Sequence, residues 1–128
     1  MGLDWSLNLG SLPEKSALGR RRCYPFSNGN DGAYPIAGLT FDASGNAYGT
    51  TYSAGAFSGI VFRLKPPGGM EDSWTFGALY GFTGSPDGAQ PAASLILDRH
   101  GKPYGTTQKG GTGTCSFYGC GTVFEVSP

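Results

Sequence analysis

The sequence contains an internal repeat at a spacing of 56 residues. Residues 24–57 align without a gap with residues 80–113, and 15 of these 34 positions are identical, too many for a chance match. A further block, Gly-Ile-Val-Phe at 59–62, returns as Gly-Thr-Val-Phe at 121–124, so the second copy carries six extra residues between Gly113 and Gly121. Repeats of this kind fold into similar units that bury their apolar faces against each other. This feature therefore constrains the fold more than any other.

Each copy predicts short strands and no helix. In residues 74–82, Trp, Phe, Ala, Tyr and Phe recur at every second position, which is typical of a strand. The segments 42–46 and 98–102 each combine an aspartate that can accept backbone hydrogen bonds with a glycine that tolerates positive φ, and they predict hairpin turns. The remaining strands are expected at 37–41, 47–51 and 60–64, and again at 93–97, 103–107 and 122–126.

We therefore expect an all-β fold of two four-stranded antiparallel propeller-like blades, a partial β-propeller. Residues 60–62 are apolar on both faces, as in a strand that is covered on both sides. A closed propeller needs at least about four blades, so further blades or a second copy of the chain are expected as partners. The expected division is an irregular or flexible N-terminal segment (1–23), a first repeat with its linker (24–73) and a second repeat (74–128).

Charge and hydropathy exclude several classes of partner. Nine Lys and Arg balance nine Asp and Glu, so no field of one sign would draw the chain to nucleic acid or an anionic surface. The three arginines at 20–22 are typical of a solvated segment. The longest aliphatic run, residues 95–97, is far shorter than the roughly 20 residues of a membrane span. We expect no nucleic acid, no membrane span and no signal peptide in this chain.

Three motifs occur twice in the same order. They are Asp-Gly-Ala-x-Pro, Leu-x-x-Asp-x-x-Gly-x-x-Tyr-Gly-Thr-Thr and Gly-x-Val-Phe, at 31–35, 39–51 and 59–62 and again at 87–91, 95–107 and 121–124. This ordered set resembles the GloVer tandem repeats of bacterial choice-of-anchor proteins, over residues 24–128. The resemblance implies a propeller-like array in an extracellular or cell-surface protein. It carries over no catalytic residues and no cofactor.

The inserted segment of the second copy contains two cysteines. Residues 115–121 are similar to the cysteine-bearing variant of the GloVer repeat, and in an exported protein Cys115 and Cys120 are expected to form a disulfide. A zinc site would need two further ligands, and the only histidine, His100, is expected two strands away, so no metal is predicted. Cys23 is left over, either as a free thiol or as half of a pair whose partner is absent.

No catalytic site is predicted. His100 aligns with Ser44 in a turn, which favours a solvent-facing position over a role in a triad. The aspartates Asp42 and Asp98 recur at one position of the repeat and Asp31 and Asp87 at another, which favours the same structural task in each copy. For Asp31 and Asp87 the alternative is contact with calcium or with a sugar hydroxyl. Tyr48 and Tyr104 are expected in the core, with stacking on sugars as the alternative.

A specific site should fall on residues that only one copy has, which points to Phe117 and Tyr118 in the insertion. The leading hypothesis is a non-catalytic repeat module of an exported or surface-attached bacterial protein, with a scaffold or interaction role toward a surface glycan or a protein. The alternatives are a carbohydrate-binding module that uses Asp31, Asp87, Phe117 and Tyr118, and a fragment of a propeller glycosidase or lyase with catalytic carboxylates on missing blades.

Overall fold

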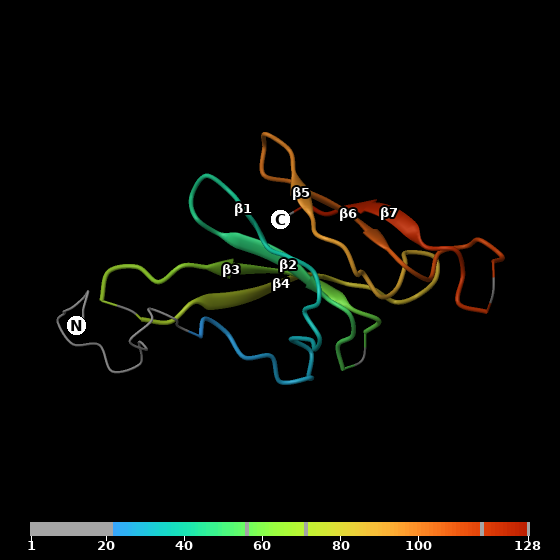
Figure 1. Cartoon of the computed structure of the whole chain (residues 1–128), viewed down its shortest axis with the longest axis horizontal. Coiled ribbons are helices and arrows are strands. Elements are labelled where there is room, and N and C mark those ends of the chain that lie inside the picture. The colour runs from blue at the N-terminus through green and yellow to red at the C-terminus, as the bar shows by residue number, and fades with distance from the viewer. Residues whose placement is uncertain (1–21, 56, 71, 116, 128) are drawn as a thin grey trace.

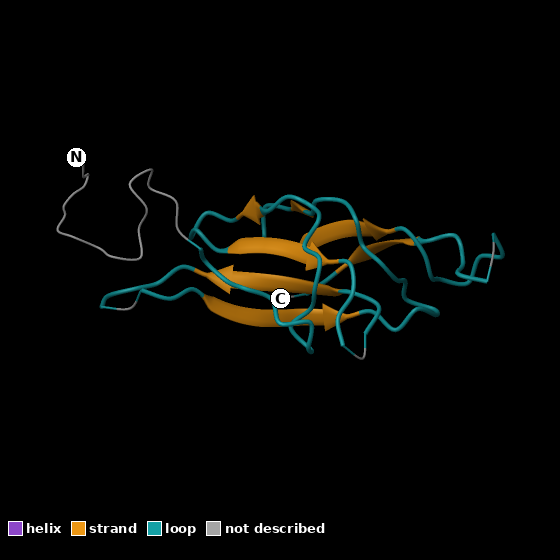
Figure 2. Ribbon diagram, turned by 60° about the horizontal axis from the view of Figure 1, so that its bottom comes forward, coloured by secondary structure: helices purple, strands orange, loops and turns teal. Residues whose placement is uncertain are grey.

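Strands and loops make up the described part of the chain. The computed structural model describes residues 22–55, 57–70, 72–115 and 117–127. Within these ranges seven strands form two antiparallel sheets and no helix occurs (Figures 1 and 2). The all-β prediction is confirmed. A search of the same ranges for a helix long and apolar enough to cross a membrane finds none.

The first sheet contains four strands in sequential order. They are β1 (Thr40–Phe41), β2 (Ala47–Thr51), β3 (Ile60–Lys65) and β4 (Thr75–Gly81). The predicted turn joins β1 to β2: one Asp42 carboxylate oxygen accepts the N–H groups of Ser44 (2.9 Å) and Asn46 (3.0 Å). Gly45 closes this turn at φ 87°, a conformation that side chains disfavour.

The second sheet contains three strands, β5 (Ile96–Leu97), β6 (Pro103–Thr107) and β7 (Thr122–Glu125), again in sequential order. Asp98 organises its turn as Asp42 does, accepting the N–H groups of His100 (2.8 Å) and Lys102 (3.0 Å). The β1–β2 and β5–β6 turns project from the same side of the molecule (Figure 1). Neither sheet closes on itself.

The sequence predicts that the strand at 74–82 belongs to the second sheet. In the structure it belongs to the first sheet. It appears as β4 and pairs antiparallel with β3, from Ile60 opposite Gly81 to Lys65 opposite Thr75. The short link 66–74 joins these strands as neighbours, which is the usual outcome for consecutive antiparallel strands. The sheets therefore have four and three strands instead of four and four. Residues 1–21, with two of the three arginines, lie outside the described ranges, and Arg22 and Cys23 are exposed.

Two apolar clusters hold the sheets. The first lies on the face of the first sheet that points away from the second and contains Ala47, Ala54, Ile60, Phe62 and Leu64, with Tyr24, Phe26, Trp74 and Phe76 packed against it. The second lies between the sheets and contains Tyr48, Val61, Phe82, Leu95 and Val126, with Leu79, Leu97 and Phe124 packed against it. The residues of β3 at 60–62 are at most 2 % exposed, so this strand is covered on both faces as predicted. Tyr48 is also in the core, as predicted. Its counterpart Tyr104, which was expected there too, is only half-buried and belongs to neither cluster, and its hydroxyl donates to Asp98 and Glu125.

Equivalent positions of the repeat make matching ring contacts. We call residues 24–79 the first half and residues 80–127 the second half, since each begins with one copy of the repeat. In the first half the Phe26 ring meets Phe62 edge-on, with centroids 5.1 Å apart and planes at 61°. In the second half the Phe82 ring meets Phe124 at 4.9 Å and 64°. One face of each sheet is thus covered by the aromatic segment that precedes it in the chain, which stabilises the sheet by removing apolar surface from water.

Candidate functional site

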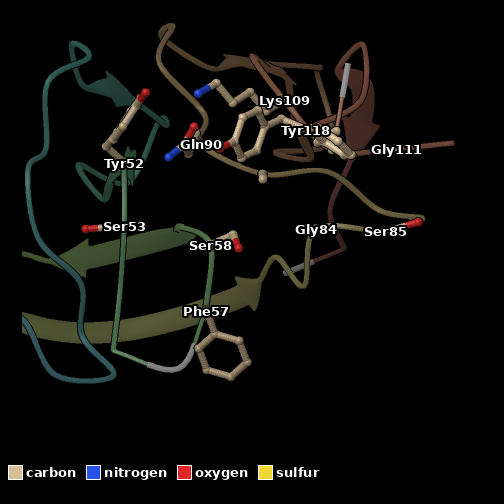
Figure 3. A pocket seen from close by; sticks show the side chains of 13 residues that line it. Tyr52, Ser53, Phe57, Ser58, Gly84, Ser85, Gln90, Lys109, Gly111 and Tyr118 are labelled. Carbon is tan, nitrogen blue, oxygen red and sulfur yellow. The ribbon is translucent and has the colours of Figure 1, made fainter. Parts of the chain in front are cut away.

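A pocket of about 680 Å³ lies between the two halves, at the ends of their loops. The first half contributes Tyr52, Ser53, Phe57 and Ser58, which lie between β2 and β3. The second half contributes residues 84–85, 89–90, 109–111 and 117–118. Figure 3 shows Tyr52 and Phe57 on the loop from the first half, and Lys109 and Tyr118 on the segments from the second. The pocket exists only because the two halves pack together.

Three aromatic side chains of the pocket lining are exposed. Phe117 is fully exposed, Tyr118 is 65 % exposed and Phe57 is 39 % exposed. The Lys109 ammonium lies 4.7 Å from the centre of the Tyr118 ring, a cation–π contact that restrains this ring. Exposed rings around a hollow offer flat apolar surfaces to a ligand, in addition to any hydrogen bonds.

Gln90 supplies a buried polar group to the pocket. Its side-chain oxygen Oε1 is buried and has no hydrogen-bond partner among the described residues. Its backbone is held on both sides, because its N–H donates to the Ser58 carbonyl (2.7 Å) and its carbonyl accepts the Gln108 N–H (3.1 Å). A buried acceptor without a partner costs about 1–3 kcal/mol, and a ligand hydroxyl or amine would recover this free energy once the Gln90 side chain turns Oε1 toward the pocket.

The inserted segment is tied back to the pocket. Cys115 and Cys120 are joined by a disulfide with their Cα atoms 5.1 Å apart. The Gly110 N–H donates to the Tyr118 carbonyl, and the Gly121 N–H donates to the Gly110 carbonyl (3.0 Å). These bonds hold Phe117 and Tyr118 beside the pocket although both rings are exposed.

Asp31 does not line this pocket and is engaged within its own loop. Its carboxylate accepts the Ser27 hydroxyl (2.6 Å) and the Tyr24 hydroxyl (3.0 Å). The hydrogen bond from the Ser27 side chain is the main cause that holds the pKa of Asp31 below its ordinary value. In the structure this carboxylate closes the loop that follows Phe26.

Asp87 occupies the equivalent place in the second half and is also absent from the pocket lining. It accepts the Thr83 hydroxyl (2.7 Å) and the Tyr80 hydroxyl (2.5 Å). Partial burial acts to raise its pKa, but the hydrogen bonds from Thr83 and Tyr80 outweigh burial and leave the pKa of Asp87 below its ordinary value. The structure thus brings Phe117 and Tyr118 to one pocket and places both aspartates elsewhere.

Acid should destabilise the fold through four repeated aspartates. Hydrogen bonds lower the pKa values of Asp31, Asp42, Asp87 and Asp98 in the folded chain. A lowered pKa stabilises the fold at pH values above 3.8, the ordinary pKa of aspartate. This contribution is lost as the pH falls below that value. The midpoint of thermal unfolding, measured from pH 6 to pH 2, should therefore fall mainly below about pH 4. Asp42→Asn should be less stable at pH 6 and less sensitive to acid, and an unchanged acid slope in this variant would contradict the assignment.

Sequence reasoning missed most of the pocket lining, including Tyr52, Gln90 and Lys109. Each of these three differs between the two copies, since they align with Gln108, Tyr34 and Ser53. The rule that pointed to the insertion, that a specific site uses residues unique to one copy, would have included them. They were missed because nothing in the aligned sequences shows which loops meet.

Within the described ranges no three side chains of His, Cys, Asp or Glu come together as a metal site would require. His100 is exposed in the β5–β6 turn, as predicted, and its contact with Asp98 is made by its backbone. Cys23 is an exposed free cysteine.

Comparisons with protein-family models, with curated proteins and with solved structures found no match for this chain. The resemblance to GloVer repeats therefore stays a prediction from the motifs of the chain.

Proposed function

We propose that this chain is a non-catalytic interaction module that binds carbohydrate in the pocket between its two halves. The observation that carries the proposal is the combination of exposed rings, at Phe57, Phe117 and Tyr118, with the buried unpaired oxygen of Gln90. A pyranose ring has an apolar C–H face that packs on an aromatic ring, and hydroxyl groups at its edge that donate to an amide oxygen. The aromatic rings and the amide oxygen that these two kinds of contact need are both found in the pocket lining.

The lining favours binding over hydrolysis. No Asp or Glu is among the described residues that line the pocket, whereas a glycosidase needs two carboxylates that flank the scissile bond. The lining does contain the hydroxyl groups of Tyr52, Ser53 and Ser58, which can donate and accept at a sugar edge. We therefore favour a binding module over a fragment of a glycosidase or lyase.

The setting we propose is an exported or cell-surface bacterial protein of the GloVer type, in which the two sheets act as propeller-like blades. The motif order supports this proposal, and so does the four-stranded antiparallel first sheet. The Cys115–Cys120 disulfide adds weak support for an oxidising compartment. In that setting a surface glycan is the natural ligand.

Removing the two exposed rings of the insertion should weaken glycan binding. The wild-type chain is first screened on a glycan array, and the best glycan is then titrated in solution by calorimetry. Because each ring contact contributes about 0.5–1.5 kcal/mol, Phe117→Ala combined with Tyr118→Ala should weaken binding by roughly 5- to 150-fold. Gln90→Met keeps an unbranched side chain without the amide oxygen and should also weaken binding.

The matched control is Phe41→Ala, which removes an exposed ring on β1, outside the pocket lining. It should bind the glycan as the wild type does. The proposal fails if no glycan binds the wild-type chain, or if the double variant binds as tightly as the control.

A further inference from the structure

Equivalent residues of the two halves differ sharply in exposure. Val61 of β3 is 0 % exposed, whereas its counterpart Val123 of β7 is 83 % exposed. In the opposite sense, Leu95 of the second half is 2 % exposed, whereas its counterpart Leu39 is 51 % exposed. Val61 and Leu95 belong to the single cluster that joins the two sheets. The exposed residues Val123 and Leu39 are thus the repeat counterparts of Val61 and Leu95, which lie on opposite sides of that contact.

The contact inside the chain shows how the two sides fit. The face of the first sheet with Tyr48 and Val61 packs on the face of the second sheet with Leu95 and Val126. Polar contacts fix the register beside this cluster. The Thr40 hydroxyl donates to the Leu95 carbonyl (2.6 Å), and the Gly38 N–H donates to the Ser94 hydroxyl (3.1 Å).

The first half has exposed apolar residues on the side where the second half has Leu95. We call this side the leading face; its members are Tyr34 (66 % exposed), Ile36 (62 %), Leu39 (51 %) and Phe41 (57 %). Their counterparts at 90, 92, 95 and 97 are all buried or half-buried. Leu39 sits over Gly49 in the way that Leu95 sits over Gly105, so the backbone places these leucines alike.

Two exposed apolar residues, on the outer strands β5 and β7, lie on the side of the second half that corresponds to Val61, with Tyr104 and Thr106 of β6 between them. We call this side the trailing face; its exposed apolar members are Ile96 (70 % exposed) and Val123 (83 %). Their counterparts, Thr40 and Val61, are half-buried and buried in the contact between the sheets. Exposed apolar patches on a small protein are typical of interaction surfaces.

We propose that copies of this chain associate head to tail, with the trailing face of one copy packed on the leading face of the next. The contact would reproduce between two chains the packing that joins the two sheets within one chain. Because the formal net charge is zero, charge repulsion between copies does not oppose this stacking. Because the two faces differ, the contact is heterologous, and it extends until a ring closes or a filament forms. It uses no residue of the pocket lining and is independent of the proposed glycan site.

The test blocks one face at a time in the full chain. Leu39→Asp places a charge on the leading face and Val123→Asp places one on the trailing face. Both positions are more than half exposed, so both variants should fold, which circular dichroism and thermal unfolding verify. Sedimentation velocity and light scattering from micromolar to millimolar concentration should show that the wild type grows beyond 13.3 kDa and that each variant stays at one chain.

The decisive sample is an equimolar mixture of the two variants. Each copy then has one intact face, so the mixture should form a discrete dimer of twice 13.3 kDa and nothing larger. Met70→Asp, at a 98 % exposed position in the β3–β4 connection, serves as the control and should associate like the wild type. A wild type that stays monomeric, a single variant that associates like the wild type, or a mixture without a discrete dimer would each overturn the proposal.

Discussion

Replacing Phe82 with alanine should lower the free energy of unfolding by about 3–5 kcal/mol, a large share of what a domain of this size has. Phe82 is 1 % exposed and belongs to the cluster between the sheets. Its ring centre lies 4.9 Å from that of Phe124 and 5.2 Å from that of Tyr80. Alanine would leave a cavity at the contact that joins the two halves. Urea unfolding measures the effect as a lower midpoint with an unchanged slope.

The repeat provides a matched control for this variant. Phe26 is the counterpart of Phe82 and makes the same edge-on contact, with Phe62, but it is only partly buried. Phe26→Ala should therefore cost less than Phe82→Ala, since the cost scales with the area returned to water. Both variants are compared at the same protein concentration. Equal losses for both variants would contradict the assignment of Phe82 to the centre of the molecule.

Alanine at Gly88 should be the second severe substitution, with an expected loss of about 3–5 kcal/mol from strain and overlap together. Gly88 has φ 121°, a conformation that is essentially confined to glycine. A Cβ atom there would also lie 2.6 Å from Thr122 Oγ1 and 2.7 Å from Thr107 Oγ1. These hydroxyls are 2.9 Å apart, and their hydrogen bond links β6 to β7. The substitution would strain the backbone and separate the two hydroxyls.

Gly84→Ala separates strain from overlap. Gly84 has φ 102°, but a Cβ atom added there meets no other atom within 4 Å. This variant should lose only the strain contribution, about 1–2 kcal/mol. Thermal or urea unfolding of both variants gives the difference. If Gly88→Ala were no worse than Gly84→Ala, close packing over the two threonines would not be what requires glycine at this position.

The longer strands and the turns could be predicted because their causes are local, whereas the strands expected at 37–41 and 93–97 are only two residues long, at 40–41 and 96–97. The strands at 47–51 and 103–107 begin and end where the alternation and the turn residues place them. The turn aspartates Asp42 and Asp98 accept the expected backbone N–H groups within four residues of themselves. Hydrogen bonds and steric preferences over such short distances depend on the neighbouring residues alone.

The candidate site could be predicted only in part. Phe117 and Tyr118 were identified because the second copy alone has them, whereas Gln90 and Lys109 were not. Gln90 lines the pocket because its backbone is bonded to Ser58, a residue of the other half. The strand at 75–81 was assigned to the wrong sheet for the same reason, since its pairing with β3 is a choice between partners and not a local preference.

The sequence by itself determined the repeated unit: its strands, its turns and the apolar residues on both faces of the strand at 60–62. What only the tertiary structure decided is which of those faces are covered. Val61 and Val123 are the same residue at the same position of the repeat, yet one is 0 % and the other 83 % exposed. Burial depends on what packs against a face from elsewhere in the molecule, and two identical positions carry no information about that neighbour.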